Sequence, residues 1–470
     1  MTLQEVPASA DPRAEGLRGL CGGAVHLQGD PAYDMARSPW NLQMADYPAA
    51  VAYPADPDEV GDVLRAAAAA GLRVAPQGTG HGAPPLEGRL ADAVLLRTSA
   101  MTGLHIDAER RLVRASAGVL WGDLAEAAGR HGLAALHPSS PDVGVVGYSL
   151  GGGIGWYARR HGLQCNAVTA VELVLADGSF VRATADSEPE LFWALRGGAA
   201  PFGVVTALEF EVHPLDTVVA GFLAWDWTAV ERVLPGWVAW CSDAPEAVTT
   251  SFRLLEVPSA GPTPAELRGR RLAVIDGAVL GDDAQAAELI APLRSLDPEI
   301  DTVARVPAAS LVRLHLEPEG PTPGYASSML ISELPDSAVA AVIAAAGPGS
   351  GTRLAVTELR QLGGELARPD PTGGALSSLD GGFLALGLGL DGDPAVWPQL
   401  REDAARFLAA LEPWASGRQY LPMLDERTDT RKAFSPGVHA RLAAVRRAVD
   451  PNGLFVLQHQ VPTQPHRDDA

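Results

Sequence analysis

Residues 139–156 read SSPDVGVVGYSLGGGIGW, and six of the twelve positions from 144 to 155 are glycine. Because glycine has no Cβ, such a segment allows another backbone or a ligand to approach closely. No Gly-Lys-Ser/Thr follows, which excludes a P-loop, and the compact strand–GxGxxG–helix context of a nicotinamide site is missing. A tightly packed turn is the alternative, but the run of glycines favours a large flat ligand laid along an apolar ribbon of backbone.

A second glycine loop comes earlier in the chain. Residues 77–82 read QGTGHG and follow a short apolar stretch, 72–75, that is typical of a strand. The backbone N–H groups of such a loop can converge on an anion such as a pyrophosphate. An ordinary turn at the end of a strand, with an exposed histidine, explains the loop equally well.

The sequence around both loops predicts alternating helices and strands. Residues 56–59 (DPDE) have the N-cap, the proline and the acidic first turn of a helix that ends at Gly71. Asp177-Gly178 is typical of a hairpin turn. Further strands are predicted at 93–98, 103–106, 112–116, 168–176, 179–183 and 202–212, and further helices at 119–131 and 190–196.

The pattern changes near Pro214. Four strand-like runs, Ala-rich helices and Pro/Gly-rich turns follow up to residue 400, which is typical of a second α+β domain. The predicted strands are 249–255, 271–280, 328–332 and 382–389, and the predicted helices are 284–291 and 336–346. The last part returns to helix at 398–411 and 436–449, followed by a strand-like run at 454–461.

Composition and charge exclude several classes of protein. Hydrophobic residues make up 47% of the 470 residues, so a large core is expected, and the net charge of −21 opposes binding to nucleic acid or an anionic membrane surface. Three widely spaced cysteines argue against disulfides and a CxxC metal site, and no metal is expected. The sequence shows no signal peptide and no apolar run long enough to span a membrane. We expect a cytoplasmic protein.

Several motifs occur together in the order of a known family. They are QGTGH at 77–81, the glycine-rich segment, HGL at 161–163, VELVLADG at 171–178, LFWALRGGAAPFGVV at 191–205, ELRQLGGELA at 358–367 and DPNGLF at 450–455. In this combination the chain resembles the berberine bridge enzyme-like flavoprotein oxidases of the vanillyl-alcohol oxidase superfamily. The resemblance implies an α+β fold with a two-part FAD-binding domain, residues 1–215 and 401–470. It also implies an inserted α+β substrate domain, residues 216–400, with an antiparallel sheet and helices.

The resemblance also implies roles for individual residues. His81 takes the position whose imidazole is covalently attached to FAD, a link that raises the flavin's reduction potential. Position 77 is commonly Arg in the family, and Gln77 removes that positive charge but keeps a hydrogen-bond donor. Gln458 and Gln460 stand where the family usually has Asn near the flavin ring. The positions implied to bind FAD are Gln77, Gly78, Thr79, Gly80, His81, Gly82, Ser140, Asp142, Gly144, Val145, Gly147, Gly152, Gly153, Gly155, Val205 and Gln458.

Two positions depart from the family pattern. Some members attach FAD through a second bond from a cysteine, but Ser140 stands at that position, so a single attachment through His81 is implied. Met423 stands where many relatives have the tyrosine that serves as the catalytic base, and a thioether cannot accept a proton. Tyr420 is the nearest phenol in the sequence and our candidate catalytic residue. The alternatives that the sequence leaves open are Tyr148, Tyr157, Tyr325, His439 and His459.

The function implied by the resemblance is that of an FAD-dependent oxidase. Such an enzyme transfers a hydride from a small organic substrate (an alcohol, an amine or a secondary metabolite) to covalently bound flavin, and O₂ reoxidises the flavin to give hydrogen peroxide. A dehydrogenase or a cyclising tailoring enzyme of the same fold is one alternative, and a flavin-binding protein without turnover is another. The sequence leaves the substrate open, as it does the choice between monomer and homodimer.

Overall fold

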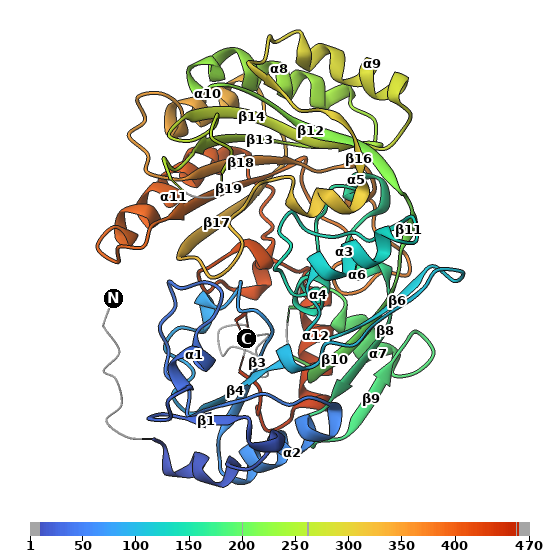
Figure 1. Ribbon diagram of the computed structural model, residues 1–470, viewed down its shortest axis with the longest axis vertical. Coiled ribbons are helices and arrows are strands. Elements are labelled where there is room, and N and C mark those ends of the chain that lie inside the picture. Colours follow the sequence, from blue (N-terminus) through green and yellow to red (C-terminus); the bar gives the residue numbers. More distant parts are fainter. Residues whose placement is uncertain (1–9, 200, 261–262, 457, 460–470) are drawn as a thin grey trace.

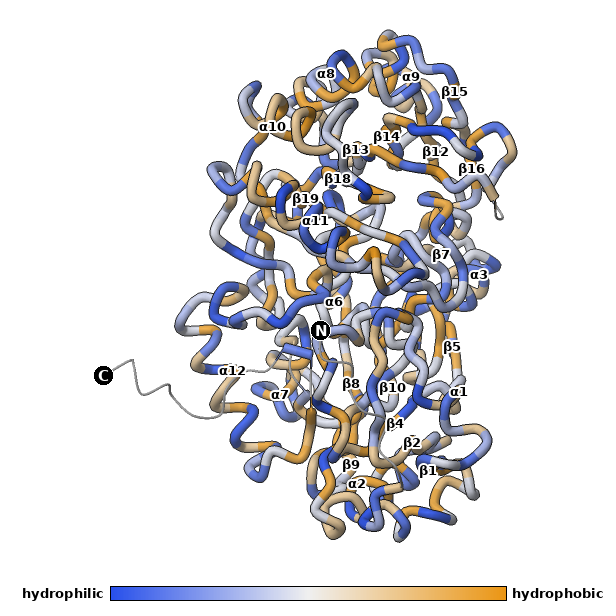
Figure 2. The backbone as a smooth tube through the Cα atoms, turned by 90° about the vertical axis from the view of Figure 1, so that its left-hand side faces the viewer, coloured by the Kyte–Doolittle hydropathy of each residue, from blue (hydrophilic) through white to orange (hydrophobic). Residues whose placement is uncertain are grey.

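Three larger β-sheets organise the molecule, a computed structural model that describes residues 10–199, 201–260, 263–456 and 458–459. Figure 1 shows the largest sheet with α8, α9 and α10 at one end, and the two smaller sheets at the other. The view turned by 90° in Figure 2 has the same two-part arrangement, with α8 to α10 far from α2 and β1. Helices mixed with largely antiparallel sheets confirm the expected α+β class.

The first sheet carries the first glycine loop. Its strand order is β1 (Val25–Leu27), β2 (Ala50–Ala52), β4 (Ala93–Arg97) and β3 (Arg73–Gln77). Strands β2 and β3 both run parallel to β4, so the carboxyl ends of β3 and β4 lie at the same edge. The predicted helix after Asp56 is α2 (Pro57–Ala69), and the Asp56 carboxylate accepts a hydrogen bond from the Glu59 amide as an N-cap should.

The second sheet is antiparallel and carries the second glycine segment. Its strand order is β5 (Leu104–Asp107), β6 (Leu112–Ser116), β10 (Val204–Glu211), β8 (Val168–Val174) and β9 (Phe180–Ala183). The helices that share its hydrophobic core are α3 (Trp121–Gly129), α4 (Val145–Gly151), α7 (Pro189–Leu195) and α12 (Pro436–Val449). The sequence predicted every one of these elements except α4.

Helix α4 corrects the interpretation of residues 139–156 as a continuous ribbon. Residues 145–151 are helical, and the helix begins after Gly144, whose carbonyl accepts a hydrogen bond from the Tyr148 amide. Gly152, at φ +131°, and Gly153, at φ +85°, end it. The helix forms because residues 145–150 contain a single glycine and bury Val145 and Ser149 against the sheet, so most of the glycines flank the helix instead of extending it.

The third sheet is formed by residues 217–390 and is antiparallel. Its strands, in order, are β15 (Ile300–Asp301), β12 (Thr217–Asp226), β14 (Arg271–Val279), β13 (Val248–Glu256), β18 (Val356–Gln361), β19 (Phe383–Leu390) and β17 (Gly324–Ile331), with β16 (Ala304–Pro307) on β12. The helices that share a core with one face are α8 (Val230–Asp243), α9 (Asp283–Arg294), α10 (Asp336–Ala346) and α11 (Trp397–Leu411). Helix α11 crosses residue 400, and the division of the chain at 215 and 400 stays a prediction.

The opposite face of the third sheet packs against the region of the second glycine segment. One hydrophobic cluster joins Ile154 and Tyr420 to Leu330 of β17 and Leu384 of β19. The short elements between the sheets are α1 (Tyr33–Arg37), α5 (Ala158–His161), α6 (Gln164–Ala167) and the pair β7 (Leu133–Ala134) and β11 (His213–Pro214). The glycine segments therefore lie between the two smaller sheets and the uncovered face of the large one.

The end of the chain returns to the first sheet. Phe455 forms a parallel bridge with Val74 of β3, so the predicted strand 454–461 is reduced to a single bridge in the described part of the chain. Asp450, which is 0% exposed, holds the turn before it: its carboxylate accepts hydrogen bonds from Arg446 at 2.5 Å and from the Leu454 amide at 2.7 Å. One buried ion pair thus fixes the C-terminal segment beneath β3.

Replacing Asp450 by alanine should lower the free energy of unfolding by about 3–5 kcal/mol, because the buried Arg446 cation loses its carboxylate. Urea denaturation followed by circular dichroism measures this change. Glu126→Ala, which removes an exposed helical ion pair to Arg130, serves as the control and should leave the curve unchanged. Equal effects of the two substitutions would contradict this role of Asp450.

Candidate functional site

The first glycine loop begins where β3 and β4 end side by side. Gly80 has φ +87°, and a Cβ there would lie 2.6 Å from Cβ of Pro39, so the turn requires glycine. The next residue, Trp40, donates its backbone N–H to the Thr79 carbonyl at 2.9 Å. The loop is thus held tightly on one side by residues 39–40.

The two glycine segments meet at this loop. A Cβ on Gly144 would contact Cγ2 of Thr79 at 3.7 Å, and a Cβ on Gly147 would meet no atom within 4 Å. On the other side of the loop, a Cβ on Gly82 would lie 3.0 Å from Nε2 of Gln458. The first glycine loop, the second glycine segment and Gln458, which are far apart in the sequence, therefore lie next to one another. Open space remains beside Gly147.

The imidazole of His81 is held on three sides. Its Nδ1 lies 2.7 Å from Oγ1 of Thr79, and its Nε2 lies 3.3 Å from Oδ1 of Asp142. The ring stacks on Trp40 with 4.0 Å between the ring centroids and an interplanar angle of 15°. Because the side chain is still 23% exposed, its orientation is fixed while the ring stays accessible.

Asp142 connects these groups. Its Oδ2 accepts hydrogen bonds from Nε1 of Trp40 at 2.6 Å and from the Gly320 amide at 2.7 Å, and its Oδ1 accepts one from Oγ of Ser140 at 2.9 Å. Burial by itself would raise the pKa of Asp142, but the hydrogen bonds from His81, Gly320 and Trp40 hold that pKa below its usual value. The carboxylate is therefore ionised at neutral pH.

The last three glycines of the second segment pack against the chain itself. A Cβ would lie 2.9 Å from a leucine side chain at Gly152, 2.6 Å from the Tyr148 ring at Gly153, and 2.3 Å from the carbonyl oxygen of His137 at Gly155. Close packing alone thus explains why glycine is required at these positions. Their part in binding FAD stays a prediction.

The remaining predicted cofactor residues lie around the same region. Val145 is 0% exposed and Val205 is 6% exposed, and both belong to the core of the second sheet. Gly78 has one near neighbour, Oγ1 of Thr98 at 3.8 Å from a Cβ built on it. Gln460 lies outside the described residues.

The surroundings of Tyr420 do not favour a role as base. Its hydroxyl oxygen accepts a hydrogen bond from the Gly153 amide at 2.9 Å, and burial raises its pKa above the usual value. Burial also raises the pKa of Tyr148, whose hydroxyl has no hydrogen-bond partner in the described part of the chain. A phenol with a raised pKa is a poor proton acceptor near pH 7, so the assignment of Tyr420 stays an untested prediction.

Asp425 is a carboxyl group that the sequence analysis missed. It follows Met423 by two residues, and its Oδ2 accepts a hydrogen bond from the Ala326 amide of β17 at 2.7 Å. Burial raises the pKa of Asp425 to about 7. A carboxyl with this pKa can take up and release a proton near neutral pH. No local pattern marks it, because its pKa follows from burial that only the folded chain creates.

The face of the large sheet opposite helices α8 to α11 carries buried charged side chains, which the sequence analysis also missed. Glu358 and Arg360 alternate on β18 and form an ion pair at 2.7 Å. On the neighbouring strands Arg253 pairs with Asp276. Nε2 of His315 lies 3.5 Å from Oδ1 of the same Asp276. The sequence pattern that could have indicated these residues is the alternation of charged residues along a predicted strand, because every second residue of a strand lies on the same face.

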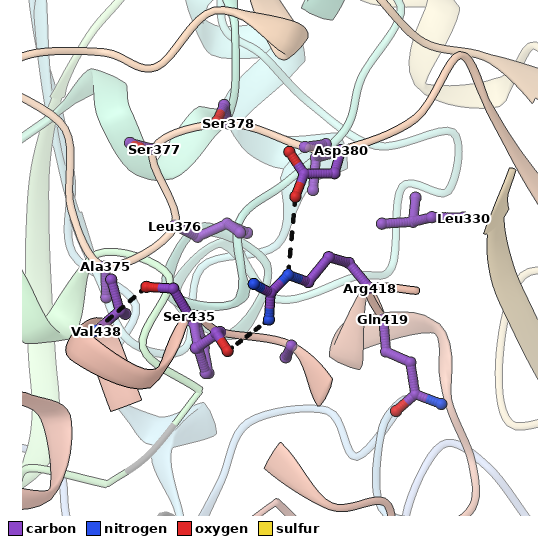
Figure 3. Close-up of a pocket in the computed structure, with 13 residues that line it drawn as sticks. Leu330, Ala375, Leu376, Ser377, Ser378, Asp380, Arg418, Gln419, Ser435 and Val438 are labelled. Atoms are coloured by element: carbon purple, nitrogen blue, oxygen red, sulfur yellow. Dashed lines mark hydrogen bonds and ion pairs between the residues drawn. The ribbon is translucent and has the colours of Figure 1, made fainter. Parts of the chain in front are cut away.

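A pocket of about 140 Å³ lies elsewhere, between residues 375–380 and the start of α12. Figure 3 shows Arg418 reaching toward Asp380, 3.8 Å away, and it also donates to the Phe434 carbonyl. None of the predicted cofactor residues lines this pocket. Among the described residues no cluster of His, Cys, Asp and Glu could hold a metal ion, and no helix is long and apolar enough to cross a membrane.

Comparison with known proteins identifies an FAD-binding family and related oxidases. Residues 48–184 match the family described as an FAD binding domain. The chain is 28% identical to (R)-6-hydroxynicotine oxidase of Paenarthrobacter nicotinovorans over 446 residues, which cover 92% of this chain and 95% of that protein. It is 32% identical to a xylooligosaccharide oxidase of Thermothelomyces thermophilus over 209 residues, 43% of this chain and 41% of that protein.

Among solved structures, wild-type Physcomitrella patens BBE-like 1 superposes with a TM-score of 0.82 at 20% identity, covering 94% of this chain and 97% of that one. This likeness shows the fold. Together with the homology to 6-hydroxynicotine oxidase and the match to an FAD binding domain, it agrees with the resemblance inferred from the sequence. The relatives are named as oxidases or as FAD-linked oxidoreductases, and this chain is assigned to that class of enzymes.

The raised pKa of Asp425 predicts a pH-dependent stability. An unfolded aspartate titrates near pH 3.9, whereas Asp425 in the folded chain titrates at about 7. The folded state therefore holds the extra proton between these values, and its stability falls as the pH rises through this range. Asp425→Asn has no carboxyl group to titrate at this position, so its stability should not fall in this way. The melting temperature of the variant minus that of the wild type should therefore increase as the pH rises from 5 to 8. A constant difference over this range would contradict the raised pKa.

Proposed function

We propose that this protein is an FAD-dependent oxidase that holds its flavin through one covalent bond to His81. The observation that carries the proposal is the setting of His81 at the end of the glycine loop, fixed by Thr79, Asp142 and Trp40 while its ring stays accessible. A bond to the flavin would replace one of the two contacts of the imidazole nitrogens, that of Nδ1 with Thr79 or that of Nε2 with Asp142, and the other contact would keep the ring oriented.

The residues around His81 fit FAD. Open space lies beside Gly147, and the backbone of residues 78–82 can donate hydrogen bonds to a pyrophosphate. Ser140 cannot form the thioether that a cysteine would, and its hydroxyl already donates to Asp142. A single attachment follows from these two residues. When bound, FAD would supply the hydride acceptor and the reaction with O₂ that yields hydrogen peroxide.

The chain's own side chains would handle the proton of the substrate. Oxidation of an alcohol or amine releases one proton for each hydride, and the group that accepts it should have a pKa near the working pH. Asp425, with its pKa raised to about 7, meets this requirement better than Tyr420. We therefore propose Asp425 as the proton acceptor in place of the tyrosine that Met423 replaces.

The substrate in this proposal is a small polar organic molecule. The face of the large sheet that lies toward the glycine segments carries Glu358 and Arg360, which are 3% and 11% exposed at their side chains. Such groups can orient hydroxyl, amine or carboxylate groups of a substrate through hydrogen bonds. The relatives named above act on a nicotine derivative and on xylooligosaccharides, so the chemistry of the substrate is not shared across them.

Replacing His81 by alanine should release the flavin. The purified wild-type protein should keep its yellow absorbance with the polypeptide after denaturation in guanidinium and gel filtration, whereas His81→Ala should lose it. The controls His105→Ala, at an exposed position of β5, and Ser140→Ala should both keep the colour. Flavin that separates from the denatured wild type would overturn the covalent bond, and a wild type that never binds FAD would overturn the proposed function.

Turnover in air should distinguish an oxidase from a dehydrogenase. With a panel of alcohols, amines and short sugars, the protein should consume O₂ and release one hydrogen peroxide for each product formed. Turnover that requires an artificial electron acceptor would favour the dehydrogenase. A dithionite-reduced protein that stays reduced in air, and that accepts no substrate of the panel, would favour a flavin-binding protein without turnover.

A further inference from the structure

Arg97, the last residue of β4, provides a positive charge beside the first glycine loop. Its Nη1 donates a hydrogen bond to Oε1 of Gln77, and the two residues stand directly opposite each other in the parallel pair β3 and β4. The same Oε1 would lie 3.0 Å from a Cβ on Gly80. The guanidinium is therefore separated from the turn of the loop by a single side chain.

The cation has no carboxylate partner in the described part of the chain. Its Nε is buried without a hydrogen bond, and none of the described acidic residues forms an ion pair with Arg97. Burial lowers the pKa of Arg97, and the largest opposing influence comes from the phenol of Tyr53 and not from an acid. An arginine held in this way is costly unless a negative charge arrives from outside the chain.

The neighbouring sequence explains why a charge is needed here. Residues 74–82 and 139–156, which include both glycine segments, contain no Lys or Arg, and the second segment contributes the ionised Asp142. The whole chain carries a net charge of −21, which repels an anionic ligand. Backbone N–H groups alone would have to hold a pyrophosphate against this field.

We propose that Arg97 supplies the charge that holds the pyrophosphate of FAD at the loop, in place of the arginine that position 77 commonly carries in the family. This inference rests on the proposed function. Parallel pairing puts residue 97 next to residue 77, so the charge has moved from the end of β3 to the end of the adjacent strand. Gln77 accepts the hydrogen bond from Arg97 and thereby positions the guanidinium under the loop.

The affinity for FAD, measured without the covalent bond, tests this role. In the His81→Ala background, Arg97→Gln should raise the dissociation constant for FAD by roughly tenfold or more, since hydrogen bonds to charged groups are the strong ones. The dissociation constant of Arg97→Lys should lie between that of the parent and that of Arg97→Gln, because lysine keeps the positive charge but lacks the planar guanidinium group. Arg130→Gln makes the same change in net charge on an exposed helix and should have no effect.

Moving the charge back is the decisive comparison. In the Arg97→Gln background, Gln77→Arg should restore most of the lost affinity for FAD. Because the swapped pair can form the same hydrogen bond in the reverse direction, a purely structural role also predicts rescue, but it predicts equal losses and gains of affinity for FAD and for riboflavin. The affinity for riboflavin, which has no phosphate, should change little among all these variants, and the loss caused by Arg97→Gln should shrink as salt is added.

The outcomes separate this inference from the proposed function. If Arg97→Gln binds FAD as tightly as its parent, or if it weakens riboflavin and FAD equally, the role of Arg97 is overturned while the proposed function stands. If His81→Ala binds no FAD, the same variants can be compared with His81 in place. The quantity measured is then the amount of flavin bound per chain in Arg97→Gln, Arg97→Lys and the double variant Arg97→Gln with Gln77→Arg. A wild type that takes up no FAD overturns both.

Discussion

The arrangement of the site depends on one buried, ionised carboxylate. Asp142 accepts hydrogen bonds from Trp40, in the segment between β1 and β2 of the first sheet, and from Gly320, in the loop before β17 of the large sheet. A buried charge needs such donors, and removing any of them would leave the carboxylate underpaired. The residues that donate to Asp142 are therefore held at fixed distances, and so is His81, which lies against both Asp142 and Trp40. Asp142 thus links the second glycine segment to His81 of the first glycine loop and to the loop before β17.

A second consequence is electrostatic. The ionised Asp142 stands in the region proposed to receive an anionic cofactor, which would be unfavourable if its charge were not compensated. Its donors neutralise much of that charge locally, and Arg97 lies next to Gln77, at the end of the adjacent strand β4. The site thus has a negative group that orients His81 and a positive group under the loop. An acidic protein can hold an anionic ligand in this way without a surface patch of basic residues.

The sequence predicts the parts of this structure that depend on local chemistry. The cap at Asp56, strands β3 and β4 and the strands of the second sheet follow from neighbouring residues, whereas β1 and β2 of the first sheet were not predicted. Helix α4 was missed because the glycines around it dominate the pattern, and the packing role of Gly155 depends on a carbonyl from a distant residue. Arg97 could not be identified from the sequence, since its position follows from the parallel register with Gln77.

The same distinction separates the cofactor half of the site from the substrate half. A binding site formed by main-chain atoms requires glycine at defined positions, and these glycines can be recognised in the sequence. The uncovered face of a sheet accepts almost any side chain without changing the fold, so residues such as Glu358 and Arg360 leave no pattern beyond their alternation. Their burial as an ion pair is costly unless polar groups from a bound molecule or water complete their hydrogen bonds. The polar substrate that we propose would satisfy this requirement if it bound beneath β18, whereas an apolar one would leave both charges underpaired.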